Sequence, residues 1–109
     1  MAVEVDDTNF EKEVLEKSKE IAVLVDFYAD WCPPCAVLKP ILEKIAEKDR
    51  RFVLVKVNVD KAPKVSNKYG VMSIPYVKLF RNREVVGEFV GAMPEEMVSE
   101  WLDKNLQNG

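Results

Sequence analysis

The sequence contains no histidine, and its 109 residues include only two cysteines. Protein zinc sites are usually tetrahedral, with four ligands that are most often cysteine and histidine. Two thiolates without histidine would fill only half of such a site, unless two chains shared the ion. We therefore predict no metal site, and we expect no cofactor.

Long apolar runs are missing as well. Hydrophobic residues make up 48% and charged residues 32% of the chain, which excludes a membrane span and a disordered chain alike. The first seven residues have neither the basic segment nor the apolar segment of a secretory leader. Unless a leader has been removed, we expect a cytoplasmic protein that does not bind a membrane.

A concentrated basic face is the third absence. The 19 acidic and 16 basic residues give a net charge of −3, and the basic residues are scattered along the chain. Proteins that bind nucleic acid usually gather lysine and arginine on one face, so we expect no nucleic-acid partner. The length suits one domain with its own core. We predict a single domain over residues 1–109, and we expect it to be a monomer.

Both cysteines lie in one five-residue motif, Trp-Cys-Pro-Pro-Cys at 31–35. The apolar run at 21–28 predicts a buried strand before the motif, and apolar residues at helical spacing predict a helix over 33–48 after it. Cys32 would then lie at or near the helix N-cap, where the positive end of the helix dipole favours the thiolate. Since only the thiolate attacks a disulfide, the motif predicts dithiol–disulfide exchange.

The spacing of the two cysteines suits such an exchange. With Cys32 at the N-cap and Cys35 three residues on, one helical turn brings the sulfurs within bonding reach. We expect Cys32, on the loop side, to be the attacking thiol and Cys35 to be the buried resolving thiol. Pro33 and Pro34 would occupy the first helical turn, where backbone N–H groups have no intrahelical partner.

A carboxylate, Asp26, stands inside the apolar run at 21–28. Burial disfavours the charged form of an acid, so the pKa of Asp26 should be raised toward neutrality. The alternative is an ordinary acid at the end of a strand, exposed to water.

The remaining pattern predicts strands and helices in alternation. The expected strands lie at 3–5, 52–59, 76–80 and 85–90. One expected helix begins at Thr8, with Glu11 completing a capping box. Two more span 62–69 and 94–106. This order indicates an α/β fold with a central mixed sheet. Helical periodicity predicts that the inward faces of the helices include Val37, Met97, Val98, Trp101 and Leu102.

The turn between the last two strands has no glycine. A tight turn there would force Arg83 to a positive φ, and a longer turn is the alternative.

Four segments carry a resemblance to a known family: Val25 to Cys35, Lys39-Pro40, Ser73-Ile74-Pro75 and Val90-Gly91-Ala92. In this order and at these separations, they resemble the thioredoxin family over nearly the whole chain. The resemblance implies a thioredoxin fold, a central mixed five-stranded sheet flanked by four helices. It also implies a thiol-disulfide oxidoreductase that reduces oxidised protein substrates through Cys32 and Cys35. A thioredoxin reductase would supply the electrons.

The resemblance also implies roles for residues outside the motif. Asp26 would lie beneath the cysteines and relay the proton of Cys35, and Lys56 would modulate that carboxylate. From the residues alone, Lys56 as a solvated residue at a sheet edge stays open. Trp31 would help to dock extended polypeptide, although a place in the core is the alternative for it.

The Ile74–Pro75 bond is implied to be cis and packed against the cysteines. There Pro75 would block metal access, and the backbone of Ile74 would offer substrate a strand-like edge. Gly91 and Ala92 would complete the apolar docking surface around Cys32. On sequence alone, a trans proline at the start of a strand stays open.

Two other functions compete with the reductase. A disulfide oxidase or isomerase differs chiefly in the dipeptide between the cysteines, where the family commonly has Gly-Pro and this chain has Pro33-Pro34. A histidine there would have favoured that alternative. A non-catalytic interaction module with the same fold is the third candidate, against which the intact cysteine pair and Asp26 argue. Two further departures, Tyr28 for a usual tryptophan and Tyr76 for a usual threonine, would alter the substrate rim.

Overall fold

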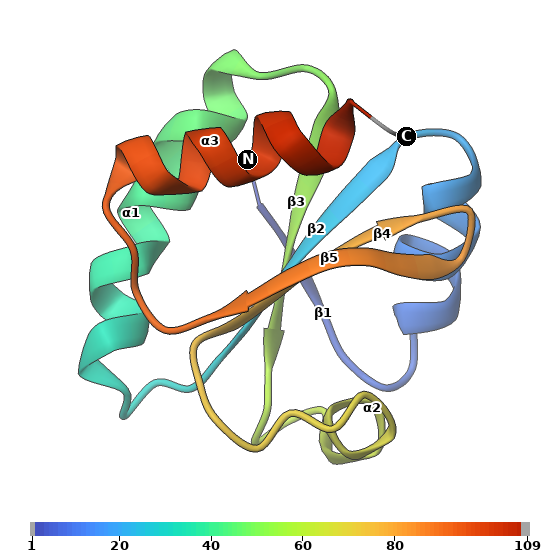
Figure 1. The fold of residues 1–109 in the computed structure, drawn as a ribbon. Coiled ribbons are helices and arrows are strands. Elements are labelled where there is room, and N and C mark those ends of the chain that lie inside the picture. The colour runs from blue at the N-terminus through green and yellow to red at the C-terminus, as the bar shows by residue number, and fades with distance from the viewer. Residues whose placement is uncertain (1, 108–109) are drawn as a thin grey trace.

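The fold is a central five-stranded sheet with helices on both faces, as predicted (Figure 1). The computed structural model describes residues 2–107. The strands are β1 (Val3–Val5), β2 (Ala22–Tyr28), β3 (Phe52–Asn58), β4 (Tyr76–Arg81) and β5 (Glu84–Val90). The helices are a π-helical segment η1 (Glu11–Glu16) that continues as a 3-10 turn η2 (Lys17–Lys19), then α1 (Pro33–Lys48), α2 (Pro63–Lys68) and α3 (Glu95–Leu106).

The sheet is mixed, with the strand order β1-β3-β2-β4-β5. Strands β1, β3 and β2 run parallel, whereas β4 is antiparallel to both β2 and β5. The register places Lys56 of β3 beside Glu4 of β1 and beside Asp26 of β2. Three charged residues therefore form one row across the parallel part of the sheet.

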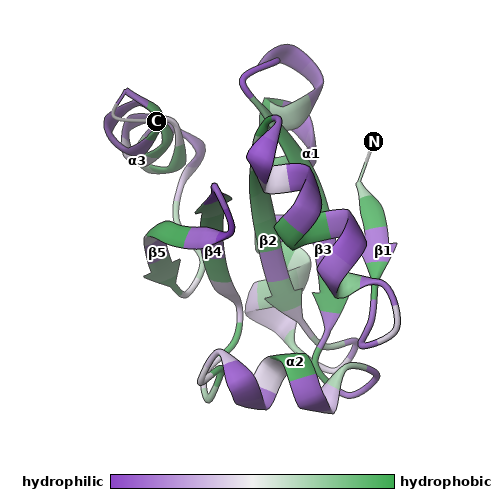
Figure 2. Cartoon of the chain, turned by 90° about the vertical axis from the view of Figure 1, so that its right-hand side faces the viewer, coloured by the Kyte–Doolittle hydropathy of each residue, from purple (hydrophilic) through white to green (hydrophobic). Residues whose placement is uncertain are grey.

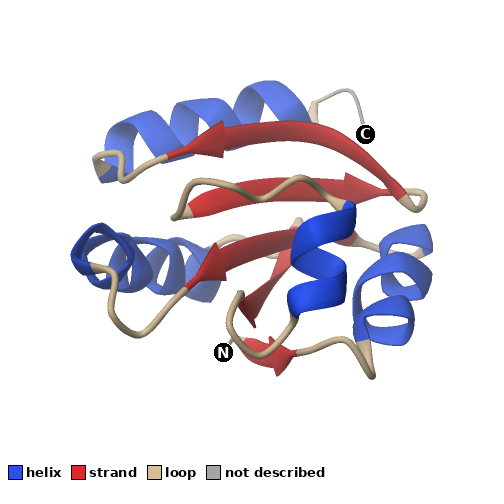
Figure 3. Cartoon of the chain, turned by 90° about the horizontal axis from the view of Figure 1, so that it is seen from below, coloured by secondary structure: helices blue, strands red, loops and turns tan. Residues whose placement is uncertain are grey.

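Strand β2 is buried on both faces because helices cover both sides of the sheet (Figure 3). Successive side chains of a strand point to opposite faces. Leu24 packs into the core that α1 and α3 cover, while Val23 and Val25 pack into the core under η1 and α2. This explains the unbroken apolar run, and β2 is green over most of its length in Figure 2. Asp26 shares the face of Leu24, beneath α1.

The predicted capping box at the start of the first helix was wrong. The hydroxyl and the backbone N–H of Thr8 both donate to Oδ1 of Asp6, at 2.6 and 2.8 Å. Asp6 Oδ1 is therefore the acceptor, and the helical residues begin at Phe10, which has no side-chain cap. Among the described residues, the hydroxyl of Thr8 thus donates to Asp6 and accepts from no backbone N–H of the helix.

Two side chains predicted to face inward point to solvent. Val37 of α1 and Met97 of α3 are exposed, whereas Leu38 and Val98, one position further on, are fully buried. On a helix of 3.6 residues per turn, one position rotates a side chain by about 100°, which moves it off the buried stripe. The prediction for Trp101 holds better, because its ring is partly buried and packs edge-on against a strand of the sheet.

The turn between β4 and β5 is tight, which was one of the two expected forms; the longer turn was the other. Asn82 and Arg83 both have positive φ, of 53° and 71°. The buried residue Ser18 of η2 holds this turn: its carbonyl accepts from the Asn82 N–H, and its hydroxyl accepts from the Arg83 N–H, both at 2.8 Å. These contacts offset the unfavourable backbone conformation of two residues that are not glycine.

Candidate active site

The two cysteines stand where the strand β2 gives way to α1. Cys32 is the N-cap of α1, with extended backbone (φ −102°, ψ 104°), and Cys35 lies one turn into the helix. The two form a disulfide, with their Cα atoms 5.3 Å apart. The backbone N–H of Cys35 donates to the sulfur of Cys32 at 3.3 Å. The predicted cap geometry is therefore confirmed.

Pro33 and Pro34 occupy the first helical positions, as predicted. Proline has no N–H, so neither residue can donate to the sulfur of Cys32. Their fixed φ suits the first turn, where an N–H would have no intrahelical partner. The N–H of Cys35 is thus the first backbone donor of α1 that can reach this sulfur.

Burial does not distinguish the two cysteines in this disulfide form. Cys32 is 5% exposed and Cys35 is 4% exposed. Both lie in a small apolar cluster with Ala29, against which Tyr28 and Ile74 pack. Cys35 is therefore buried, as predicted, and Cys32 on the loop side is equally buried in this form.

Asp26 is buried in the strand, and the alternative of a solvated acid is wrong. Its side chain is 2% exposed, and Oδ1 has no hydrogen-bond partner among the described residues. Burial raises the pKa of Asp26 to about 7, with Lys56 acting in the opposite direction and the charges of Glu4 and Glu43 adding to the rise. The carboxyl group can therefore gain or lose a proton near neutral pH.

A cavity of about 220 Å³ connects this acid with the redox pair. Besides Asp26, Cys32 and Cys35, its wall comprises Tyr28, Ala29, Asp30, Ala36, Lys39 and Lys56. The volume exceeds what one water molecule needs, and the wall offers polar partners. Asp26 and Cys35 thus share one cavity that is large enough for water.

Lys56 lies beside Asp26 in the sheet, and its alternative as a fully solvated edge residue is wrong. It is partly buried in β3, between β1 and β2. Its ammonium lies 5.0 Å from the centroid of the Tyr28 ring, in a cation–π contact.

The loop that precedes β4 lies against the cysteine cluster. The Ile74–Pro75 bond is cis, as the resemblance implied, so the trans alternative is wrong. Ile74 packs on the cluster of Cys32 and Cys35. The carbonyl of Pro75 accepts from the N–H of Gly91 at 2.8 Å, and Gly91 has a φ of +90°, where glycine is favoured. This bond ties the loop to the end of β5, next to the exposed Ala92.

Trp31 belongs to the surface, and its alternative as a core residue is wrong. Its side chain is 68% exposed, and its Nε1 donates to Oδ2 of Asp60 at 2.8 Å. The ring therefore stands in a fixed position beside Cys32 without being buried.

Comparison with known proteins identifies the family. The family model described as thioredoxin matches residues 1–104. The chain belongs to the thioredoxin family. It is 43% identical over 106 residues to a thioredoxin of Buchnera aphidicola subsp. Baizongia pistaciae, covering 96% of this chain and 95% of that protein. It is 41% identical over 107 residues to a thioredoxin of Rickettsia bellii, covering 97% and 100%.

A thioredoxin of Chlorobaculum thiosulfatiphilum is 38% identical over 104 residues, with 94% of each chain covered. Membership of this family, together with the Cys32–Cys35 disulfide, makes the protein a thiol-disulfide oxidoreductase that reduces protein disulfides. The predicted fold and the predicted function are both confirmed.

Sequence reasoning missed several residues near the predicted site residues. Asp60 fixes Trp31 from 29 residues away, and Glu4 accepts a hydrogen bond from the Tyr28 hydroxyl at 2.6 Å. Met72, in the loop before the cis bond, is 95% exposed. The sequence signal for Met72 is its position three residues before Pro75. Asp60 and Glu4 have no such local signal.

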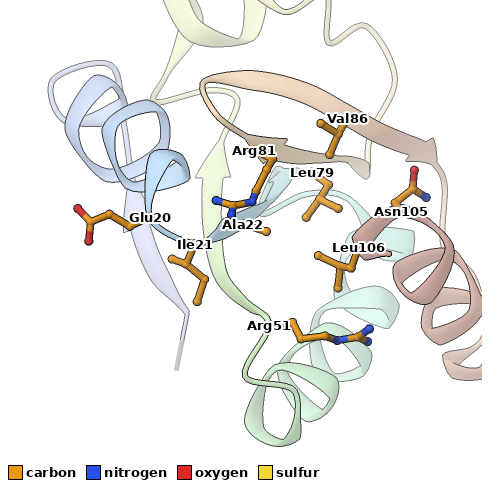
Figure 4. Close-up of a pocket in the computed structure, with 9 residues that line it drawn as sticks. All are labelled: Glu20, Ile21, Ala22, Arg51, Leu79, Arg81, Val86, Asn105 and Leu106. Atoms are coloured by element: carbon orange, nitrogen blue, oxygen red, sulfur yellow. The ribbon is translucent and has the colours of Figure 1, made fainter. Parts of the chain in front are cut away.

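Other features of the described residues carry no chemistry of this kind. Within residues 2–107, no cluster of three or more metal-ligating side chains occurs, and no helix is long and apolar enough to cross a membrane. A hollow of about 260 Å³, between the start of β2 and the end of α3, has Arg51 and Arg81 among its wall residues (Figure 4). It is smaller than most small-molecule sites, and Asp49 and Asp103 already bind Arg51.

Proposed function

We propose that Cys32, Cys35 and Asp26 carry out the disulfide reduction in two exchange steps. In the reduced protein, the thiolate of Cys32 attacks one sulfur of a target disulfide. A mixed disulfide forms between Cys32 and the target, and the second target sulfur leaves as a thiolate that takes a proton from solvent. Only thiolates react in this way, so the position of Cys32 at the start of α1 favours it as the nucleophile.

In the second step, Cys35 resolves the mixed disulfide. The thiol of Cys35 gives its proton to the carboxylate of Asp26, and the resulting thiolate attacks the sulfur of Cys32. The first target sulfur then leaves as a thiolate. The Cys32–Cys35 disulfide has formed, and two electrons have passed to the target.

The observation that carries this proposal is the cavity that Asp26 shares with Cys35. A general base works best when its pKa lies near the working pH, and burial raises the pKa of Asp26 to about 7. Its Oδ1 has no hydrogen-bond partner among the described residues, so it is free to accept a proton. Lys56, beside it in the sheet, would adjust that affinity.

The docking surface for target proteins would comprise Trp31, Ile74, Pro75, Gly91 and Ala92. The exposed ring of Trp31 and the partly buried Ile74 flank the cysteine cluster. The loop at Ile74 would offer its backbone to an extended target segment as a strand edge. Pro75 is buried and follows Ile74, which packs on the cysteine cluster; it would keep metal ions from reaching the cysteines.

Each turnover leaves the protein oxidised, so an electron donor must reduce the disulfide again. We propose a thioredoxin reductase in that role, with oxidised proteins as substrates. A dithiol that is kept reduced fits a reducing compartment such as the cytoplasm. We further propose that the chain works as one domain and as a monomer.

The Pro33-Pro34 dipeptide is where this protein departs from the common pattern of its family. Two prolines fix two successive φ angles and leave the sulfur of Cys32 without an N–H donor at either position. We propose that this stiffens the loop between the cysteines and thereby adjusts the redox potential of the pair.

Trapping of mixed disulfides tests the order of the two thiols. The variant Cys35→Ser keeps the nucleophile and loses the resolving thiol, so it should accumulate a mixed disulfide with a protein substrate such as insulin. The matched variant Cys32→Ser should accumulate little. Efficient trapping by Cys32→Ser alone would reverse the assignment.

A further inference from the structure

A row of three charged residues crosses the sheet next to the proton acceptor. Glu4, Lys56 and Asp26 are register partners on β1, β3 and β2. Register partners on adjacent parallel strands point to the same face, and neighbouring strands are about 4.8 Å apart. Lys56 therefore stands between two carboxylates that lie on either side of it.

The ammonium of Lys56 forms a salt bridge with neither carboxylate in the described part of the chain. It lies instead over the ring of Tyr28, 5.0 Å from the centroid. The hydroxyl of the same tyrosine donates to Oε2 of Glu4 at 2.6 Å. One side chain of β2 thus contacts both the lysine and the outer carboxylate, and it also lines the cavity of Asp26 and Cys35.

We infer that Glu4 and Tyr28 are positioning residues for the proton relay, because together they set how strongly Lys56 acts on Asp26. The Tyr28 hydroxyl holds the Glu4 carboxylate, and the Tyr28 ring holds the Lys56 ammonium. This arrangement keeps Lys56 from pairing fully with either acid. The inference rests on the proposed role of Asp26 as the proton acceptor for Cys35.

Other charges also face Asp26. Glu43 and Lys39 approach from α1, and Asp30 lies in the loop that follows β2. The charges of Glu4 and Glu43 both raise the pKa of Asp26, while that of Lys56 lowers it. Glu43 has no contact with Tyr28 among the hydrogen bonds of residues 2–107, so it acts through charge alone.

Two substitutions should shift the pKa of Asp26 in opposite directions. Glu4→Gln removes the carboxylate that competes for Lys56, so the pKa of Asp26 should fall. Tyr28→Phe keeps the ring but frees the Glu4 carboxylate to pair with Lys56, so the pKa of Asp26 should rise. The carboxylates of Glu4 and Asp26 belong to strands two spacings apart, about 10 Å. Removing the charge of Glu4 should therefore alter the ionisation constant of Asp26 by a factor between about 2, as in bulk water, and about 15, as at an effective dielectric constant of about 20.

The double variant Glu4→Gln/Tyr28→Phe shows whether Tyr28 affects the pKa of Asp26 through the competition of Glu4 for Lys56 or directly. If Tyr28 acts through Glu4, adding Tyr28→Phe to Glu4→Gln should change nothing further. Glu96→Gln, at an exposed acid in the first turn of α3, controls for the change in net charge. The titration of the Asp26 carboxyl carbon by NMR, on the oxidised protein, gives the readout for all four variants.

The same variants are assayed for insulin reduction between pH 5.5 and 8. The acid limb of the profile should move to lower pH in Glu4→Gln and to higher pH in Tyr28→Phe. Opposite shifts of the Asp26 pKa, with no additional shift in the double variant and with matching shifts of the acid limb, support the inference. The same pKa shifts with an unchanged rate profile would keep the coupling of the three side chains and contradict the proposed relay. Equal effects of Tyr28→Phe in both backgrounds, or no response to Glu4→Gln, overturn it. In that case a slow Asp26→Asn variant would leave the proposed relay standing.

Discussion

Asp26 and Lys56 are register partners across β2 and β3, yet no hydrogen bond or salt bridge joins their side chains within residues 2–107. A buried acid that has no strong partner is held near its neutral form, and the pKa of Asp26 is raised to about 7. At any pH above the pKa of the carboxyl in the unfolded chain, burial of Asp26 therefore lowers the free energy of unfolding.

The first prediction concerns stability. The folded pKa of Asp26 exceeds the unfolded value of about 3.9, so stability should fall as pH rises from about 4 to 7 and then level off. Asp26→Asn should accordingly stabilise the oxidised protein at pH 7 to 8, by an amount on the order of 3 kcal/mol, and the gain should shrink toward pH 4. Denaturant melts across this range measure it, with Glu96→Gln, at an exposed acid of α3, as the control. An equal effect at all pH values would contradict the account.

The second prediction concerns the rate. Without the carboxylate of Asp26, the thiol of Cys35 must lose its proton to water, so Asp26→Asn should slow insulin reduction at least about tenfold. The loss should fall on the resolving step, which means that mixed disulfide accumulates in stopped reactions. Unchanged rates would show that Asp26 takes no part in the chemistry.

The third prediction concerns the reactivity of the two thiols. In the reduced protein, limiting iodoacetamide near neutral pH should alkylate Cys32 first, because the start of α1 and the N–H of Cys35 favour its thiolate. Peptide mapping by mass spectrometry reads the result. Preferential labelling of Cys35 would mean that the roles are exchanged.

The fourth prediction concerns the β4–β5 turn. Ser18 is fully buried, and its hydroxyl donates to the carbonyl of Leu15 while accepting from the N–H of Arg83. Ser18→Ala should lower the free energy of unfolding by about 1–3 kcal/mol, because it leaves these groups unsatisfied. Insulin reduction should stay normal at 25 °C. The half-buried Ser99→Ala is the comparison, and an equal loss in both variants would count against this role of Ser18.

Local patterns of the sequence predicted much of this fold. The run before Cys32 and the helical spacing after it gave β2 and α1, and the burial of Asp26 followed from its apolar neighbours. The positive φ of Arg83 was expected for a tight turn, which was one of the two forms left open. In each case the signal lies within a few residues of the feature, where backbone geometry and periodicity act directly.

Contacts between distant residues could not be predicted. Tyr28 meets Glu4 only because β1 pairs with β3, and the exposed Trp31 is fixed by Asp60, which is remote in sequence. The predicted cap at Thr8 failed for a different reason: Asp6 is the acceptor in this turn, and Thr8 is a donor to it. Side chains that choose among several partners do so in the folded structure, which the local pattern does not contain.

The reduction potential of the Cys32–Cys35 pair tests the central claim most directly. Among proteins with such cysteine pairs, thioredoxins have the most reducing potentials. The upper limit expected for the reduction potential here is therefore taken from the family. Equilibration with glutathione or dithiothreitol buffers should give a value below about −230 mV, low enough to reduce protein disulfides. A value near −120 mV, typical of strong disulfide oxidants, would contradict the assignment of this protein as a reductase.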